Sequence, residues 1–207
     1  MFLSRLRLNP ADPSARRDMA DPYEMHRTLA RVYAPDAVQP PHRFLWRQER
    51  NADGWPDGTV LVQASEPGRW HVIEALAGYA TSLEADKPVD LGAFVMTGRR
   101  YRFRLQVNPT VTRDGKRHGL TREDEQLGWL ARQGQRHGFV VEAASRGASE
   151  RLSARAGQRR ITVHSVQFDG ILSATDALLL QAALMGGLGH AKALGLGLLS
   201  LAPVRMD

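Results

Sequence analysis

The sequence contains no cysteine. This excludes disulfides, zinc sites built on thiolates and a catalytic cysteine, and it fits a reducing compartment. No run of about 18 apolar residues is present, so we expect no membrane-spanning helix. The opening segment Met1–Leu8 alternates with arginines instead of forming the apolar core of a secretory signal. These absences favour a folded protein that neither enters a membrane nor carries a leader for secretion.

Motifs that bind metals or nucleotides are also lacking. The glycine-rich stretch Gly186–Ser200 has no Gly-Lys-Ser/Thr, which excludes the phosphate-binding loop of an NTPase. It follows an apolar segment and precedes a strand-like one, the reverse of a dinucleotide-binding fingerprint. We expect neither a metal nor a cofactor. Six histidines show no metal-ligand spacing and are interpreted as surface or core residues: His42, His71, His118, His137, His164 and His190.

Acidic residues are scarce in the second half of the chain. Residues 1–100 carry 13 basic and 13 acidic residues, whereas residues 101–207 carry 15 and 9, so the net charge of +6 arises in the second half. Within Arg99–Arg160 there are 15 basic and 6 acidic residues. A basic half of this kind indicates a polyanionic partner, with nucleic acid first. A coding bias that places arginine on solvated faces would give the same composition.

Hydrophobic patterning in the first half indicates the order strand, helix, strand, strand, helix, strand. Phe2–Leu8 alternates like a half-buried strand. A helix is predicted to begin at Pro22, after an N-cap at Asp21, and to end at about Tyr33. The other expected elements are a turn-rich link at Asn9–Pro13 with a polar stretch at Ser14–Met19, strands at Arg43–Glu49 and Thr59–Ala64 joined by turns at Asp53-Gly54 and Asp57-Gly58, a short helix within Val72–Leu83 and a strand near Val89–Met96.

The second half repeats this order. Within Arg99–Val107, apolar residues occupy one face and Arg100, Arg102 and Arg104 the other, which predicts a half-buried strand whose cationic face is either RNA-facing or merely solvated. We therefore expect an α+β fold of two tandem ferredoxin-like (RRM-like) βαββαβ domains, at 1–95 and 99–207. The other expected elements are a basic loop at Arg113–His118, a helix capped by Thr121 and ended by Gly138, strands at Phe139–Ala143 and Ile161–Asp169, a turn at Gly170, a helix through Ala177–Leu184 capped by Ser173 or Thr175, and a last strand at Gly197–Ala202.

The candidate catalytic segment is Asp21–Leu29. On a helix, the spacing of three between Tyr23 and His26 places the phenol and the imidazole on one face. Histidine is the side chain best suited to proton transfer near neutral pH, and a neighbouring tyrosine can orient or assist it. Arg27 offers a fork of donors that suits phosphate. Proton transfer beside a phosphate anchor could support cleavage of RNA without metal; packing and capping are the alternative interpretation of the same residues.

Four stretches, in this order, resemble the CasE family, the endoribonucleases of type I-E CRISPR systems within the repeat-associated RNA-processing superfamily. The resemblance extends over nearly the whole chain. The stretches are Leu6–Pro10 with the pattern Leu-Xaa-Leu-Asn-Pro, Asp21–Arg27, Arg102–Leu105 followed by Asn108-Pro109 and Gly115–Arg117, and Gly195–Ser200 with Gly-Xaa-Gly before apolar residues.

The resemblance implies much that composition does not show. It implies two ferredoxin-like domains, a cytoplasmic location, and metal-free cleavage of CRISPR precursor RNA at the 3′ base of the repeat hairpin. It further implies a 2′,3′-cyclic phosphate end, retention of the crRNA product and association with the other subunits of Cascade. The family's catalytic histidine and tyrosine correspond to His26 and Tyr23, and its basic hairpin, which enters the groove of the RNA stem, to about Arg151–Arg160.

The sequence leaves three questions open. It does not decide whether His26 is the base or the acid, or which arginines enter the RNA stem. It also leaves a non-catalytic RNA-hairpin-binding protein, or a structural subunit of an RNA–protein complex, as the alternative to an enzyme. The residues expected to contact RNA are Arg27, Arg102, Arg104, Lys116, Arg117, Arg155, Arg159, Arg160, Lys192, Gly195 and Gly197.

Overall fold

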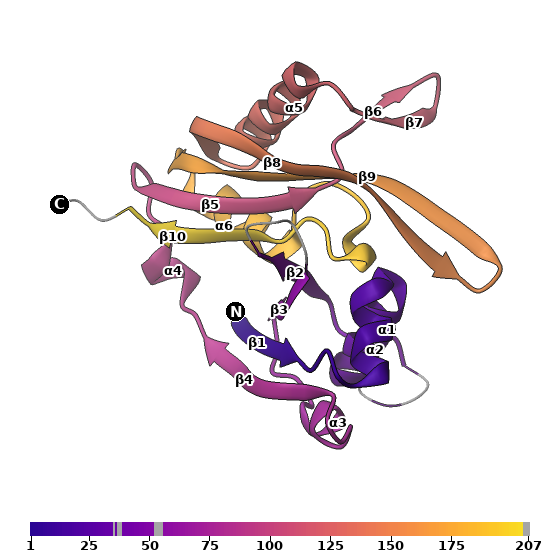
Figure 1. Ribbon diagram of the computed structural model, residues 1–207. Helices are drawn as coiled ribbons and strands as arrows, with labels where there is room; N and C mark the ends of the chain where they lie inside the picture. The colour runs from indigo at the N-terminus through magenta and orange to yellow at the C-terminus, as the bar shows by residue number, and fades with distance from the viewer. Residues whose placement is uncertain (35, 37–38, 52–55, 205–207) are drawn as a thin grey trace. The chain divides into compact units, whose positions relative to one another are not determined.

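The computed structural model describes residues 1–34, 36, 39–51 and 56–204 (Figure 1). The chain forms two compact units. The first comprises Met1–Val89 together with Ser153–Ile161 and Ala193–Gly195, and the second comprises the remaining residues from Asp90 onward. In the described part of the chain, no helix has the length and apolar character needed to cross a bilayer. The expected domain limits, 1–95 and 99–207, stay a prediction.

The first unit contains a four-stranded antiparallel sheet with the order β2-β3-β1-β4. The helices fall between β1 and β2 and between β3 and β4, which gives the βαββαβ arrangement of a ferredoxin-like domain. The elements are β1 (Phe2–Leu8), α1 (Pro13–Ala20), α2 (Pro22–Tyr33), β2 (Phe44–Arg50), β3 (Pro56–Ala64), α3 (His71–Glu74) and β4 (Ala80–Pro88).

Alternation along β1 produces the core of the first unit. Leu6 and Leu8 are buried, whereas the intervening Arg5 and Arg7 are exposed, as the sequence predicts. Helix α2 contributes apolar side chains at helical spacing, which pack against the same face of the sheet. The residues of α2 in this core are Met25, Leu29, Val32 and Tyr33.

A buried carboxylate in α1 holds the helices of the first unit together. The side chain of Asp18 has no accessible surface, and it accepts hydrogen bonds from Arg17 Nη2 at 2.7 Å, Thr28 Oγ1 at 2.6 Å and Tyr79 Oη at 2.7 Å. Burial and the bond to Asp18 raise the pKa of Tyr79, which therefore acts as a donor. A buried charge is tolerated only when it is paired in this way, so Asp18 fixes α1 against α2 and the start of β4.

The second unit repeats the topology of the first. Its four-stranded sheet has the order β10-β5-β9-β8, which is equivalent to that of the first sheet, so the two tandem ferredoxin-like domains expected from the sequence are confirmed. A small hairpin is inserted after β5. The elements are α4 (Leu91–Phe94), β5 (Arg100–Val107), β6 (Thr110–Arg113), β7 (Lys116–Gly119), α5 (Glu123–Arg136), β8 (Phe139–Ala156), β9 (Arg159–Ala174), α6 (Ala177–Gly186), η1 (Lys192–Leu194) and β10 (Leu199–Pro203).

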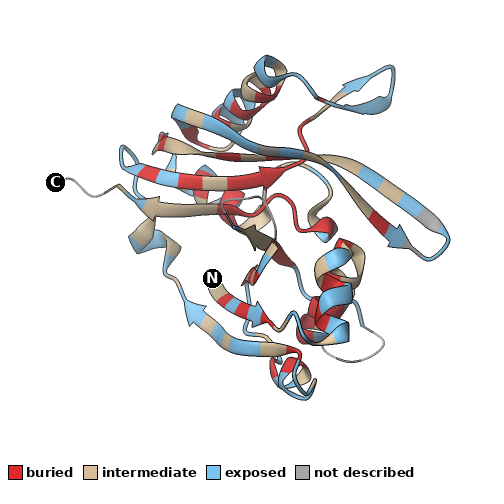
Figure 2. Ribbon diagram, viewed as in Figure 1, coloured by how far each residue is buried: buried red, intermediate tan, exposed pale blue. Residues whose placement is uncertain are grey.

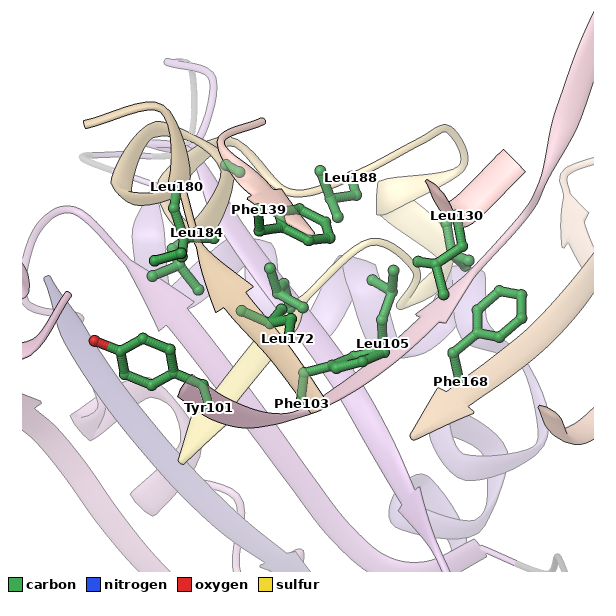
Figure 3. Close-up of a cluster of buried hydrophobic side chains, with 14 of the residues drawn as sticks. Tyr101, Phe103, Leu105, Leu130, Phe139, Phe168, Leu172, Leu180, Leu184 and Leu188 are labelled. Atoms are coloured by element: carbon green, nitrogen blue, oxygen red, sulfur yellow. The ribbon is translucent and has the colours of Figure 1, made fainter. Parts of the chain in front are cut away.

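The apolar face of β5 forms the centre of the second core (Figure 3). Tyr101, Phe103 and Leu105 are buried and lie beside Phe168 and Leu172 of β9. In contrast, β8 and β9 continue well beyond β5, which pairs with β9 only from residue 166 to 173. Most residues along this distal part of the hairpin are exposed or half-buried (Figure 2), whereas Ala154 and Ser165 are buried.

Two expectations for the first half were wrong, and one helix was not predicted. The polar stretch Ser14–Met19 belongs to helix α1, because Asp12 caps it by accepting a bond from the Ala15 N–H at 2.8 Å. The helix expected within 72–83 is only the four-residue α3, and β4 begins at Ala80. The strand expected near Val89–Met96 is the short helix α4, whose N-cap is Asp90. The turn predicted at Asp53-Gly54 lies outside the described residues.

In the second half, one expected loop, one expected turn and two expected helix caps were wrong. The basic loop is the hairpin β6–β7, which turns at Asp114-Gly115. Gly170 is not a turn, because β9 runs through it, and a Cβ there would lie 2.0 Å from the Ala143 carbonyl oxygen. The N-cap of α5 is Arg122 instead of Thr121, and that of α6 is Asp176 instead of Ser173 or Thr175.

Candidate active site

The candidate site begins at the N-terminus of α2. Asp21 caps this helix, because its Oδ1 accepts a hydrogen bond from the Tyr23 N–H at 2.9 Å, and Pro22 occupies the first helical position. Tyr23 and His26 therefore lie on one face of the first two turns, as the spacing of three predicts. Both side chains are half-buried.

An aromatic stack fixes the imidazole of His26. The His26 ring stacks on Phe44 of β2, with ring centroids 5.1 Å apart and an interplanar angle of 18°. Phe44 stacks in turn on Tyr33, with centroids 5.0 Å apart, and Tyr33 and Trp70 form a T-shaped pair. This row of rings leaves the imidazole little freedom to rotate, so Phe44 positions His26.

The two nitrogens of the His26 ring are in different environments. Nδ1 is buried and makes no hydrogen bond to any described residue, which leaves Nε2 as the nitrogen available to a ligand. Burial lowers the pKa of His26 below its ordinary value of 6.5, so the neutral imidazole is the main form at neutral pH. The arrangement can exchange a proton with a ligand only through Nε2.

The tip of the β8–β9 hairpin, residues 153–161, belongs to the first unit, as does α2. The hairpin expected at Arg151–Arg160 is present and turns at Gly157. The Arg155 N–H donates a hydrogen bond to Oδ2 of Asp21 at 3.1 Å, while the other oxygen of this carboxylate caps α2. Asp21 thus ties the first turn of the candidate catalytic helix to the basic hairpin.

The arginines of this hairpin differ in their contacts. The residue Arg155 is exposed, and Arg160 donates a long hydrogen bond of 3.3 Å to the hydroxyl of Ser153. The side chain of Arg159 lies outside the described part of the structure. The role of all three in binding RNA stays a prediction.

The phosphate anchor expected at Arg27 is already ion-paired. Arg27 Nη1 lies 3.0 Å from Glu24 Oε1 on the same helix, and Glu24 also lies 3.7 Å from Arg17. The Arg27 side chain is 63% exposed, so this pair contributes little and is open to competition by a phosphate.

The cationic face of β5 is partly neutralised. Arg104 pairs with its cross-strand neighbour Asp169 at 2.7 Å, and Arg100 pairs with Glu142 at 2.8 Å. Arg102 is exposed and forms no ion pair among the described residues. Lys116 and Arg117 are exposed on β7 of the inserted hairpin. The face is thus less cationic than the sequence alone indicates.

The glycine-rich stretch has structural constraints of its own. Gly195 has a φ of +77°, and a Cβ there would lie 2.8 Å from the ring of Trp46 in the first unit. Gly197 has a φ of +92°, and a Cβ there would lie 2.5 Å from the Leu188 carbonyl oxygen. Lys192 Nζ donates to the carbonyl of Gly186, the last residue of α6, at 2.7 Å. Left-handed backbone and close packing therefore require the two glycines, and contact of this stretch with RNA stays a prediction.

Comparison with known proteins identifies the family. A family profile described as "CRISPR associated protein" matches residues 1–203. The curated protein "CRISPR-associated endoribonuclease Cse3" of Thermus thermophilus is 36% identical over 98% of this chain and 100% of its own. The chain belongs to the CasE family of CRISPR-associated proteins.

Two further relatives agree with this assignment. The "CRISPR system Cascade subunit CasE" of Escherichia coli is 29% identical, and the match covers 99% of this chain and all of the relative. A solved structure of the endoribonuclease Cse3 bound to a 19-nucleotide RNA has a TM-score of 0.88 at 36% identity, and it covers 98% of this chain and all of that one. The resemblance inferred from the four sequence stretches is therefore confirmed.

Proposed function

We propose that this protein is the endoribonuclease that matures CRISPR RNA in its host. It cuts the precursor at the 3′ base of the repeat hairpin, leaves a 2′,3′-cyclic phosphate, needs no metal, and stays bound to the crRNA as a subunit of Cascade in the cytoplasm. The names of its relatives support nuclease activity and RNA binding. The observation that carries the proposal is the imidazole of His26, which stacks on Phe44 with its Nδ1 buried, so that burial lowers its pKa.

The proposed chemistry is attack of a ribose 2′-OH on the adjacent phosphorus. Nε2 of neutral His26 accepts the 2′-OH proton while the bond between O2′ and phosphorus forms and the bond to O5′ breaks. The leaving O5′ then takes a proton from water or from the imidazolium. Because His26 supplies the proton acceptor that a metal-bound hydroxide supplies in other nucleases, no metal is needed. The lowered pKa makes His26 a base in this scheme, since little imidazolium is present at neutral pH to act first as an acid.

Tyr23 and the cations have supporting roles in the proposal. Tyr23 lies one helical turn before His26 and orients or polarises the 2′-OH by hydrogen bonding. Positively charged side chains hold the RNA backbone and steady the charge of the phosphorane. The proposed RNA contacts are those of the β8–β9 hairpin, Arg155, Arg159 and Arg160, together with Arg27, Arg102, Arg104, Lys116, Arg117, Lys192 and the backbone at Gly195 and Gly197.

The experiment that tests the proposal uses end-labelled repeat RNA and purified protein in excess EDTA. We expect one cut at the 3′ base of the stem and a 3′ end that resists phosphatase until acid opens the cyclic phosphate. RNA that is bound but stays intact would contradict the enzyme and identify a non-catalytic RNA-binding subunit. Cleavage that EDTA abolishes would contradict the role given to His26.

A further inference from the structure

A polar pocket of the second unit has no place in the chemistry proposed above. It lies between the last turns of α5, strand β6 and the turn that precedes η1, and its volume is about 470 Å³. An isolated antiparallel bridge between Asn108 and His190 holds this turn beside the end of β5. The side chains of the pocket on which the inference depends are Trp129, Arg132, Gln133, Arg136 and His190.

The two arginines of the pocket are unpaired cations. Arg132 and Arg136 are exposed and lie one turn apart on the same face of α5, where like charges repel. Neither guanidinium pairs with a carboxylate within the described ranges of the chain. The N-terminal end of α5 is different, because each of its carboxylates has an arginine partner. These pairs are Arg113–Glu125, Arg122–Asp124 and Arg146–Glu123.

Cations from other elements act on two histidines in or near the pocket. Burial, followed by the charges of Arg117 and Lys192, lowers the pKa of His190. Burial also lowers the pKa of His137, and the charges of Arg136 and Lys192 add to this effect. Among the residues that the structure describes, none that lines the pocket is an aspartate or a glutamate. The pocket is therefore a concentration of positive charge without an internal counter-charge.

We propose that this pocket, the α5 pocket, binds a backbone phosphate of RNA through Arg132 and Arg136, as an anchoring point separate from the β8–β9 hairpin. The inference rests on the proposed function, because the ligand is the RNA that the enzyme cuts. The guanidinium fork matches the oxygens of a phosphate, and His190 and Gln133 supply further donors at the rim.

The composition of the pocket favours an RNA backbone over a base or an acidic peptide. Trp129 is only 5% exposed, so it offers no free ring face on which a base could stack. An acidic protein segment would need an apolar contact surface as well as charge. The large apolar side chain of the pocket, Trp129, is too deeply buried to provide that surface. A phosphodiester chain satisfies the cations without needing either feature.

The test compares two variants that each lose two positive charges. R132Q/R136Q removes the arginines of the α5 pocket, whereas R113Q/R122Q removes two exposed arginines that pair with carboxylates at the other end of α5. Affinity for a ten-nucleotide oligouridylate is measured by fluorescence anisotropy at several salt concentrations, and cleavage of repeat RNA is measured in parallel. We expect R132Q/R136Q to bind roughly tenfold more weakly and to reduce the salt slope by about 1, with a clearly smaller change for R113Q/R122Q.

A second measurement uses the wild-type protein. A phosphate bound beside His190 should raise the pKa of this imidazole, which an NMR titration with and without the oligouridylate can follow. Equal salt slopes for the two variants, or an unchanged His190 titration, would overturn the α5 pocket as an RNA site. Normal RNA binding by R132Q/R136Q with impaired assembly into Cascade would also overturn it and would assign the pocket to an acidic protein partner. Failure of the proposed function is a separate result, because wild-type protein would then leave repeat RNA uncut.

Discussion

Replacing Phe44 by leucine tests whether the aromatic stack controls the acid–base behaviour of His26. Phe44 stacks on both His26 and Tyr33, and each ring contact is worth about 0.5–1.5 kcal/mol beyond area burial, so F44L should lower the free energy of unfolding by about 1–3 kcal/mol. Loss of the ring also lets the imidazole move, and a misplacement of about 1 Å can cost roughly 10²-fold in rate.

The pH dependence of cleavage gives the sharper readout. Burial lowers the pKa of His26, and a base must be neutral, so the wild-type rate should fall only below the ordinary value of 6.5. F44L admits water to the ring, which should raise this pKa and move the acid limb of the rate profile to higher pH. Stability should show the same linkage: wild-type stability falls as pH drops below 6.5, since the unfolded chain then binds more protons, and F44L should weaken this dependence.

The assay is single-turnover cleavage of repeat RNA between about pH 5 and 8. V60A is the matched control, because Val60 is fully buried in β3 of the same core and its truncation destabilises the unit without touching the imidazole. An acid limb at the same pH in F44L and wild type, or an equal loss of rate in F44L and V60A, would refute the positioning role of Phe44.

Three further perturbations follow from the structure. D18A leaves two buried hydroxyls without an acceptor and should lower the free energy of unfolding by about 2–5 kcal/mol in urea titrations; a loss below about 1 kcal/mol would contradict the network. G195A places a Cβ against an indole at positive φ and should cost about 1–3 kcal/mol in the same assay, and wild-type stability would show that the loop yields. Replacing Arg155, Arg159 and Arg160 together by glutamine should weaken RNA binding and reduce its salt slope by roughly 2–3, whereas unchanged affinity at low and high salt would remove the hairpin from the interface.

Features that depend on residues close together in the chain were predictable from the sequence. The alternation along Phe2–Leu8 and Tyr101–Val107 and the Asp21-Pro22 cap appear in the structure as expected, because half-buried strands and helix N-termini are decided by nearby residues. Asp12-Pro13 carries the same cap signal as Asp21-Pro22. The helix that follows was nevertheless missed, because its sequence is mostly polar and one of its two buried residues is the charged Asp18.

Features decided by distant partners were not predictable. The extent of the β8–β9 hairpin was missed, because the distal part of both strands is rich in polar and charged residues and has no long hydrophobic alternation. The stacking of His26 on Phe44 and the bond from Arg155 to Asp21 join residues far apart in the chain. Hydrophobic periodicity carries no information about such contacts. His26 could therefore be predicted as a catalytic candidate from the sequence, but the residues that position it could not.

The most direct test of the account is the H26A variant, measured for both cleavage and binding of repeat RNA in EDTA. Proton transfer depends on one imidazole and RNA affinity on arginines elsewhere, so H26A should cleave roughly 10²–10⁴-fold more slowly and bind within a few fold of wild type. Y23F should lose less, because it removes one hydroxyl and keeps the ring. Cleavage by folded H26A at the wild-type rate would contradict the assignment of the active site to α2.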